Sequence, residues 1–496
     1  PAPAAPAPLP VSAPDVEPVE AGEEQIVTVE SPLYRARFSN RGAQLVDFEL
    51  LRHPEKRGGD PTNLVAPRDP GRVDFPFAIL SSDGALNERV NRGLYTVSRS
   101  EERGETVLRF RWSDGRDLVE KTFRLHPDRY LFGFDIEMQT AAPATWRTVV
   151  GPGLREILPE EAGNRFATVG FGVVQQAGEL EVIQREKAPR FQILAPPIDF
   201  AGLQDNYFLA VLKPRESASV TFRSIRIPSP AEGEEGRKEL YVGVTAPGNR
   251  LAGSAYFGPK EADRLDAAGL ENTLQFGFFG FISRILLVAL TWVNTFTHNY
   301  GWSIVVLTAI IKLLLFPLQH KSMVSMKKMQ QVQPKMNAIK DRYKKARTDP
   351  EQRQKMNLEI MKLYKQEGIN PASGCVPLLL QLPILWAFYT LLSYAIELRG
   401  APWILWIQDL SVKDPYYITP ILMTVTMFLQ QWITPTTADP VQRRVFLIMP
   451  IVFGWLFKEF PSGLVLYWFV QNILSIIQQL ILNRYWKSHP AAEATR

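Results

Sequence analysis

A single lysine lies inside an apolar segment that is long enough to cross a bilayer. The segment reads GWSIVVLTAIIKLLLFPL, residues Gly301–Leu318, and the lysine is Lys312. A lysine at membrane depth costs roughly 2.5–3.5 kcal/mol, so such residues usually face a partner or a watery cavity, or extend to the interface. Lys312 is about six residues, roughly 9 Å, from the nearer end of the segment. At this depth we favour a hydrated groove over a side chain that only extends to the interface.

Other polar residues in apolar segments share helix faces. Thr308 and Lys312 are four residues apart, while Gln471, Ser475 and Gln478 follow the i, i+4, i+7 spacing. Hydrogen bonding between helices explains each of these residues taken singly. As a cluster around a lysine they favour a polar groove. Three further polar residues in apolar segments are Gln381, Thr424 and Thr426.

No carboxylate in the predicted spans can pair with Lys312. The nearest acids, Glu397 and Glu459, fall at the outer edges of the spans. A proton-relay transporter needs intramembrane Asp, Glu or His chains, so this class is disfavoured, although a polytopic small-molecule transporter or channel stays open as an alternative. Lys312 is therefore free to attract an acidic group that passes through the membrane. No GxxxxGK[ST] sequence is present, so we expect no ATP motor.

Redox and metal chemistry have no support in the residue pattern. The lone Cys375 excludes an internal disulfide and a cysteine-based metal cluster. The five histidines have no ligand spacing, so we expect no metal, no cofactor and no enzymatic chemistry. They are His53, His126, His298, His320 and His489.

The 496 residues divide by composition into a polar part and an apolar part near Leu270. Residues 1–23 form a Pro/Ala-rich linker, PAPAAPAPLPVSAPDVEPVEAGE, which should be extended. Because the chain opens on a linker, we expect it to be a processed or truncated form.

Residues 24–268 predict one large all-β domain. Alternating apolar residues between Gly, Asp and Pro turns are typical of an antiparallel sandwich. Some large β-sandwiches process sugars, so a carbohydrate-processing ectodomain is a third hypothesis, but no positioned acid and base can be singled out. The predicted strands are Gln25–Val29, Tyr34–Phe38, Gln44–Leu50, Thr106–Trp112, Leu118–Leu125, Tyr130–Met138, Phe208–Leu212, Ser219–Ile227, Glu239–Val244 and Gly253–Phe257.

Five transmembrane helices are predicted after residue 300. We expect spans at residues 301–318, 375–394, 416–433, 445–457 and 464–482, with Pro317 ending the first. Residues 319–370 carry thirteen Lys or Arg against five Asp or Glu, which places them in the cytoplasm. The same rule assigns residues 395–415 to the periplasm, and the loop 434–444 and the tail 483–496 to the cytoplasm. Residues 269–300 predict an amphipathic helix that lies in the interface, anchored by Trp292.

The basic segment 319–370 predicts an antiparallel helical hairpin. One stripe runs from Met323 to Tyr343 through Met336, and a second contains Leu358, Met361 and Tyr364. We interpret the stripes as the seam between the two helices. Two alternatives are an adaptable methionine surface for apolar clients and a charged surface for lipid headgroups.

The chain resembles the YidC-type membrane protein insertases of Gram-negative bacteria, within the YidC/Oxa/Alb family. The resemblance extends over almost everything after the linker, although that family has one more helix before it. It rests on six stretches: QPKM (Gln333–Met336), INPASGCVPLLLQLPI (Ile369–Ile384), ELRGAP (Glu397–Pro402), DLSVKDPYYITPILM (Asp409–Met423), TPTTADP (Thr434–Pro440) and FPSGLVLYW (Phe460–Trp468).

This resemblance implies a β-supersandwich periplasmic domain and a five-helix core around a hydrophilic groove. The family's groove carries one positive residue, usually Arg, and Lys312 takes that position here. Lysine keeps the charge but lacks the planar fork of arginine. Thr308 matches a groove position, and Trp468 falls at a client-contacting aromatic position beside Tyr467. The expected client-binding residues are Thr308, Lys312, Gln381, Thr424, Tyr467, Trp468, Gln471 and Ser475.

The implied function is insertion and chaperoning of membrane proteins in the bacterial inner membrane. The implied partners are nascent membrane proteins, the lipid bilayer, and the Sec translocon with its accessory subunits, but no DNA. The tail after Arg484 is short, so ribosome binding through it should be weak.

Overall fold

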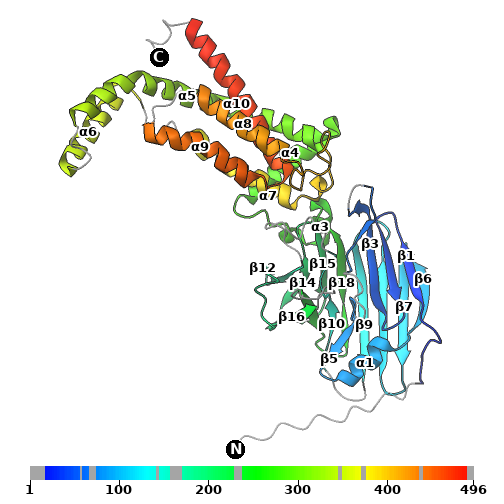
Figure 1. The fold of residues 1–496 in the computed structure, drawn as a ribbon. Helices are drawn as coiled ribbons and strands as arrows, with labels where there is room; N and C mark the ends of the chain where they lie inside the picture. The colour runs from blue at the N-terminus through cyan, green and yellow to red at the C-terminus, as the bar shows by residue number, and fades with distance from the viewer. Residues whose placement is uncertain are drawn as a thin grey trace, which may run out of the picture. The chain divides into compact units, whose positions relative to one another are not determined.

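The computed structural model describes residues 17–55, 58–65, 74–140, 145–156, 170–227, 237–343, 349–369, 376–434 and 440–488. Most of the predicted linker 1–23 therefore lies outside the described residues, as do Cys375 and the end of the tail. The chain forms two compact units, Pro1–Gln275 and Phe276–Arg496, which are described separately (Figure 1).

The first unit is built from three antiparallel sheets. Its nine-stranded sheet has the order β12-β11-β14-β15-β18-β9-β8-β7-β6, the five-stranded sheet β13-β16-β17-β10-β5, and the four-stranded sheet β1-β2-β3-β4. The strands are β1 Ile26–Glu30, β2 Tyr34–Ser39, β3 Gln44–Pro54, β4 Pro61–Asn63, β5 Ile79–Ser81, β6 Thr96–Glu102, β7 Glu105–Ser113, β8 Leu118–Leu125, β9 Leu131–Gln139, β10 Trp146–Val150, β11 Phe171–Gln176, β12 Glu179–Ile183, β13 Phe191–Leu194, β14 Ile198–Gln204, β15 Phe208–Pro214, β16 Ser219–Ile227, β17 Arg237–Thr245 and β18 Arg250–Pro259.

The two smaller sheets pack against the nine-stranded sheet. β17 contacts β11 and β14, and β3 contacts β18. Aromatic rings fill the space between the sheets: the ring centroids of Phe38 and Phe123 are 4.6 Å apart, and those of Phe48 and Phe257 are 5.6 Å apart. Helices α1 (Gly84–Arg92), α3 (Ala262–Ala268) and η1 (Glu271–Thr273) complete the unit. The predicted β-rich N-terminal domain is confirmed.

One lysine is fully buried in this core. Lys121 on β8 donates from Nζ to the carbonyl oxygens of Gly42 at 2.6 Å and Phe77 at 2.7 Å. Burial lowers its pKa to about 7, because an ammonium is poorly solvated there. The side chain thus ties the β2–β3 turn to the nine-stranded sheet.

The second unit is helical. Its elements are α4 (Gly280–Thr297), α5 (Tyr300–Arg342), α6 (Pro350–Gln366), α7 (Val376–Tyr394), η4 (Ile396–Leu398), α8 (Ile418–Ile433), α9 (Pro440–Phe457) and α10 (Ser462–Ser488). Among the described residues, α4, α5 and α10 are long and apolar enough to cross a membrane. Shorter apolar helical stretches are Leu379–Tyr394, Ile418–Ile433 and Phe446–Phe457.

The prediction that Pro317 breaks the helix at the end of the first span is wrong. α5 continues without interruption through Pro317 and Pro334 to Arg342. Proline has a helix-compatible φ and disrupts hydrogen bonding to the preceding turn, whereas the rest of the ladder remains. The predicted first span and the first arm of the basic segment are therefore one 43-residue helix (Figure 1).

Candidate functional site

Lys312 is buried between α5 and α10. It is 9% exposed, and its Nζ donates to Ser475 Oγ at 2.7 Å. The Ser475 hydroxyl donates in turn to the carbonyl oxygen of Gln471 at 2.8 Å. With its hydrogen used in this way, the serine oxygen is oriented to accept from the lysine. The polar faces of α5 and α10, which the sequence predicts to form one cluster, are thus in direct contact.

The Lys312 ammonium has no carboxylate partner among the described residues. An ammonium has three N–H donors, and the serine uses one of them. Thr308, one turn earlier, is fully buried, but its hydroxyl donates to the Ile304 carbonyl of its own helix at 2.6 Å. A buried cation held by one neutral hydroxyl is incompletely compensated, so a carboxylate that reached it would be strongly attracted.

The hydrogen-bonded chain extends from Lys312 to α7. Beyond Ser475, Gln471 donates from Nε2 to Gln381 Oε1 at 3.3 Å, and Gln381 donates from Nε2 to the Tyr467 hydroxyl. Five of the predicted client-binding residues are therefore linked across three helices. This path places polar atoms inside an otherwise apolar helix bundle.

Two glutamines extend the polarity toward the C-terminal ends of α5 and α10. Gln319 Oε1 and both side-chain polar atoms of Gln478 are buried, with no hydrogen-bond partner among the described residues. Such atoms require water or a bound polar group. Gln319 is not among the predicted residues of the cluster, although it lies seven residues, two helical turns, after Lys312 and so on the same face.

Asn472 is a second polar residue that the sequence reading missed. It is 4% exposed, and its Nδ2 donates to the Met423 carbonyl at 3.4 Å and to Thr426 Oγ1 at 3.3 Å. This contact joins α10 to α8 on a different face from Gln471. A buried asparagine between helices is the usual interhelical hydrogen-bonding case.

Two predicted client-binding residues lie away from the polar path. Thr424 donates to the Pro420 carbonyl at 2.8 Å and packs over Gly454 of α9, where a Cβ would collide with its hydroxyl. The Trp468 ring packs against Phe453 and Phe457 of α9, with centroids 5.8 and 5.0 Å away. Both residues therefore belong to the contact surfaces around α9.

α6 runs antiparallel along the end of α5. Ion pairs join Lys335 to Glu367 at 2.6 Å and Arg342 to Glu359 at 3.0 Å. The buried residues of α5 along this contact are Val332, Met336 and Ile339.

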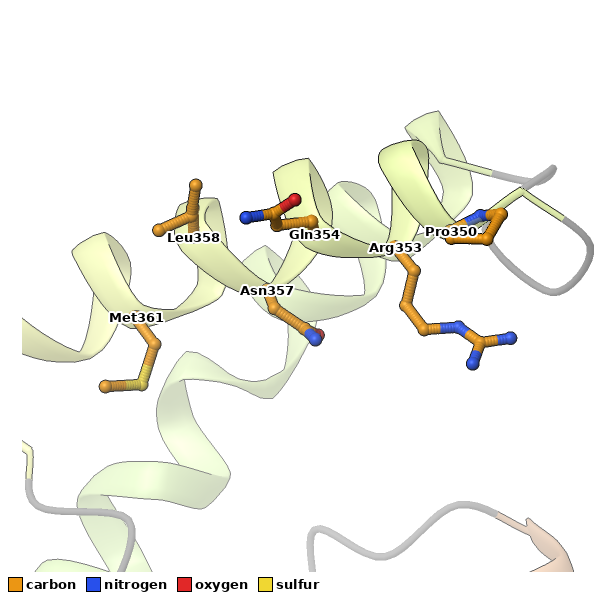
Figure 2. Close-up of a pocket in the computed structure, with 6 residues that line it drawn as sticks. All are labelled: Pro350, Arg353, Gln354, Asn357, Leu358 and Met361. Carbon is orange, nitrogen blue, oxygen red and sulfur yellow. The ribbon is translucent and has the colours of Figure 1, made fainter.

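The prediction that Met361 lies in the seam is wrong. Met361 is 49% exposed and lines a pocket on α6 with Arg353 (Figure 2). Leu358, which is 56% exposed, lines this pocket and also a second one together with Ile339 of α5. The half-buried Ile360 and Tyr364 lie on another face, and the Tyr364 hydroxyl contacts Met336 Sδ at 3.2 Å. At 100° per residue, Met361 points well away from Ile360.

The described residues contain no group of three or more His, Cys, Asp or Glu side chains that could hold a metal ion. The site offers a buried positive charge, a chain of amides and hydroxyls, and two glutamines with side-chain atoms that have no hydrogen-bond partner among the described residues. Together with a large β-domain and long apolar helices, these features define a polytopic membrane protein with a polar path inside its helical unit.

Known families match both units. Residues 26–289 match the YidC periplasmic domain, and residues 292–489 match the 60Kd inner membrane protein family. Membrane protein insertase YidC of Geobacter metallireducens is 36% identical over 99% of this chain and 90% of its own length. Membrane protein insertase YidC of Citrifermentans bemidjiense is 35% identical over 92% of this chain and 85% of its own length. A solved structure titled as an active YidC insertase with its first transmembrane domain resolved has a TM-score of 0.39, with 20% identity and 94% of both chains covered.

The chain belongs to the YidC family of membrane protein insertases. It is an inner-membrane protein with a periplasmic β-rich domain.

Proposed function

We propose that this protein inserts membrane proteins into the inner membrane along the polar path that contains Lys312. The observation that carries the proposal is the buried ammonium, bonded to the neutral Ser475 hydroxyl and paired with no described carboxylate. An acidic residue of a client, the protein being inserted, gains a charge-assisted bond there. The client's polar tail then loses less solvation than it would in lipid.

The remaining steps need no covalent chemistry. Gln319, Gln381, Gln471 and Gln478 offer amide groups to the polar tail, while the apolar client helix moves into lipid, driven by burial of its own apolar surface. The proposal includes a hydrophilic groove that is open to the cytoplasm, and an exit for the client helix along α7 and α9. It also includes that the protein acts either alone or with the Sec translocon, as the family resemblance implies.

The proposed membrane arrangement has five spans, in α5, α7, α8, α9 and α10. The basic part of α5 after residue 318 and α6 lie in the cytoplasm and receive clients. α4 lies in the outer interface, since one face packs on α5 and α7 while Phe281, Val288 and Trp292 are 79%, 65% and 60% exposed.

The test is insertion of a single-span client with an acidic tail into proteoliposomes. Lys312→Arg should keep insertion, because the charge stays, whereas Lys312→Ala and Lys312→Glu should reduce it at least tenfold. A client whose tail acids are replaced by lysines should regain insertion with Lys312→Glu. Normal insertion by both Lys312→Ala and Lys312→Glu would show that the charge has no role.

The same preparations separate the other hypotheses. A small-molecule transporter or channel would move solute without a client chain. A carbohydrate-processing ectodomain would lose all function when residues 24–268 are deleted, whereas insertion should largely survive that deletion. Crosslinking from position 471 to a stalled nascent membrane protein, with position 288 on the exposed face of α4 as the control, tests contact directly.

A further inference from the structure

Among the described strands of the β-domain, one sheet edge lacks the charges that usually protect an edge against further strand pairing. Edge strands are normally short or carry charges. Among the strands at the ends of the sheets, β4 and β5 have three residues each, while β1, β6 and β12 carry acidic residues. β13 has four residues, FQIL, with no charge. Its Phe191 and Ile193 are 52% and 61% exposed.

The free backbone groups of β13 belong to the same two residues. The Ser224 N–H donates to the Arg190 carbonyl at 3.3 Å, so residue 190 faces β16. In an antiparallel ladder alternate residues face opposite sides, so Gln192 also faces β16. Phe191 and Ile193 therefore direct their N–H and C=O groups to the open edge, where no described strand pairs with them.

Arginines lie beside this edge on the same face of the sheet. Arg223 is directly opposite Phe191 in the register, and it has no ion pair or hydrogen bond among the described residues. Thr221 is opposite Ile193 and accepts a hydrogen bond from Arg147 Nη1 at 3.1 Å. Burial and the neighbouring Arg223 charge lower the pKa of Arg147, so the two cations lie near each other on this face.

We propose that β13 is a docking edge for an extended segment of another periplasmic polypeptide, with acidic and apolar residues in alternation. The segment adds as the next strand and hydrogen-bonds to Phe191 and Ile193. Its apolar residues cover these two side chains, and its carboxylates pair with Arg223 and Arg147. A second copy of this chain fits poorly, because pairing two β13 edges would bring both sets of arginines to one face.

The test uses the full chain in nanodiscs and fluorescein-labelled peptides of alternating Glu and Val, read by anisotropy. Two matched peptides control for charge and backbone: one has Lys in place of Glu, and one is N-methylated at alternate residues, which blocks strand addition. The Glu–Val peptide should bind at least tenfold more tightly than either. Equal binding of the N-methylated peptide overturns strand addition, and equal binding of the Lys peptide overturns the charge argument.

Variants of the protein locate the binding edge. Ile193→Pro removes an N–H that no described strand uses, so it should abolish binding while the thermal midpoint of the β-domain is kept. Ile193→Ser, which keeps the N–H, should weaken binding several-fold and covers the case in which the proline variant does not fold. Arg223→Glu should reverse the preference between Glu and Lys peptides, whereas Arg116→Glu, in an exposed turn of another sheet, should not. The proposal would be overturned if the two Glu variants changed the peptide preference equally. It would also be overturned if Ile193→Pro abolished self-association of the protein and left peptide binding unchanged.

Discussion

Lys312 Nζ lies 2.7 Å from Ser475 Oγ, a neutral partner for a buried charge. Ser475→Asp would supply the missing counter-ion from within the protein. We expect this variant to insert an acidic-tailed client at least tenfold less well, because the client carboxylate must now compete with an internal one. The measurement is insertion into proteoliposomes.

Ser475→Asn is the matched control for that substitution, since asparagine has a similar size but no charge. It should keep more than half of the insertion activity. Comparable loss in Ser475→Asp and Ser475→Asn would mean that the shape of residue 475, and not the free charge of Lys312, controls insertion.

The Tyr467 hydroxyl accepts a hydrogen bond from Gln381 Nε2, and the Tyr467 ring stacks on Phe388 with ring centroids 4.2 Å apart. Tyr467→Phe should keep the stack and leave the Gln381 amide without this acceptor, which costs about 1–3 kcal/mol. We expect a lower thermal midpoint in nanodiscs, against no change for Tyr416→Phe, whose side chain is exposed. An unchanged midpoint in both variants would show that the Gln381 contact contributes no stability.

Met336 and Met361 distinguish the seam of the α5–α6 pair from its outer face. Met336 is 6% exposed and Met361 is 49% exposed. Met336→Ala should destabilise the pairing by about 2–4 kcal/mol through loss of buried surface, whereas Met361→Ala should change it by less than about 0.5 kcal/mol. Hydrogen exchange of α6 amides measures both, and equal exchange in the two variants would contradict this assignment.

Residue spacing predicted the Lys312 cluster well because intramembrane polar groups must find partners. The i, i+4 rule placed Ser475 and Gln471 on one face, and the structure adds that this face meets Lys312. Spacing could not separate Thr424 from this path, since a one-dimensional pattern does not show that Gly454 opens a contact with α9.

Strand prediction succeeded where alternation was long. Leu118–Leu125 and Ser219–Ile227 have the predicted bounds, whereas the short β5 and β13 were not predicted because three or four residues carry too little pattern. The buried Lys121 could not be found either, because its core environment comes from a turn 79 residues away in sequence.

The pH dependence of β-domain stability should report on Lys121. Burial lowers its folded pKa to about 7, while the unfolded chain keeps the ordinary lysine pKa near 10.4. Between these values the unfolded state binds one more proton, so stability rises with pH above about 7, by up to about 1.4 kcal/mol per pH unit. Lys260, with a pKa lowered to about 8 by burial, adds to the rise from about pH 8.

Lys121→Met should therefore remove the rise in stability between about pH 7 and 8. The rise that Lys260 contributes above about pH 8 should remain. Pulse proteolysis of the full chain in urea, from pH 6 to 9, measures the free energy of unfolding below the range in which tyrosines titrate. The exposed Lys187→Met is the control and should keep the wild-type slope. A wild-type slope in Lys121→Met would mean that Lys121 stays charged in the folded core, held by the carbonyl oxygens of Gly42 and Phe77.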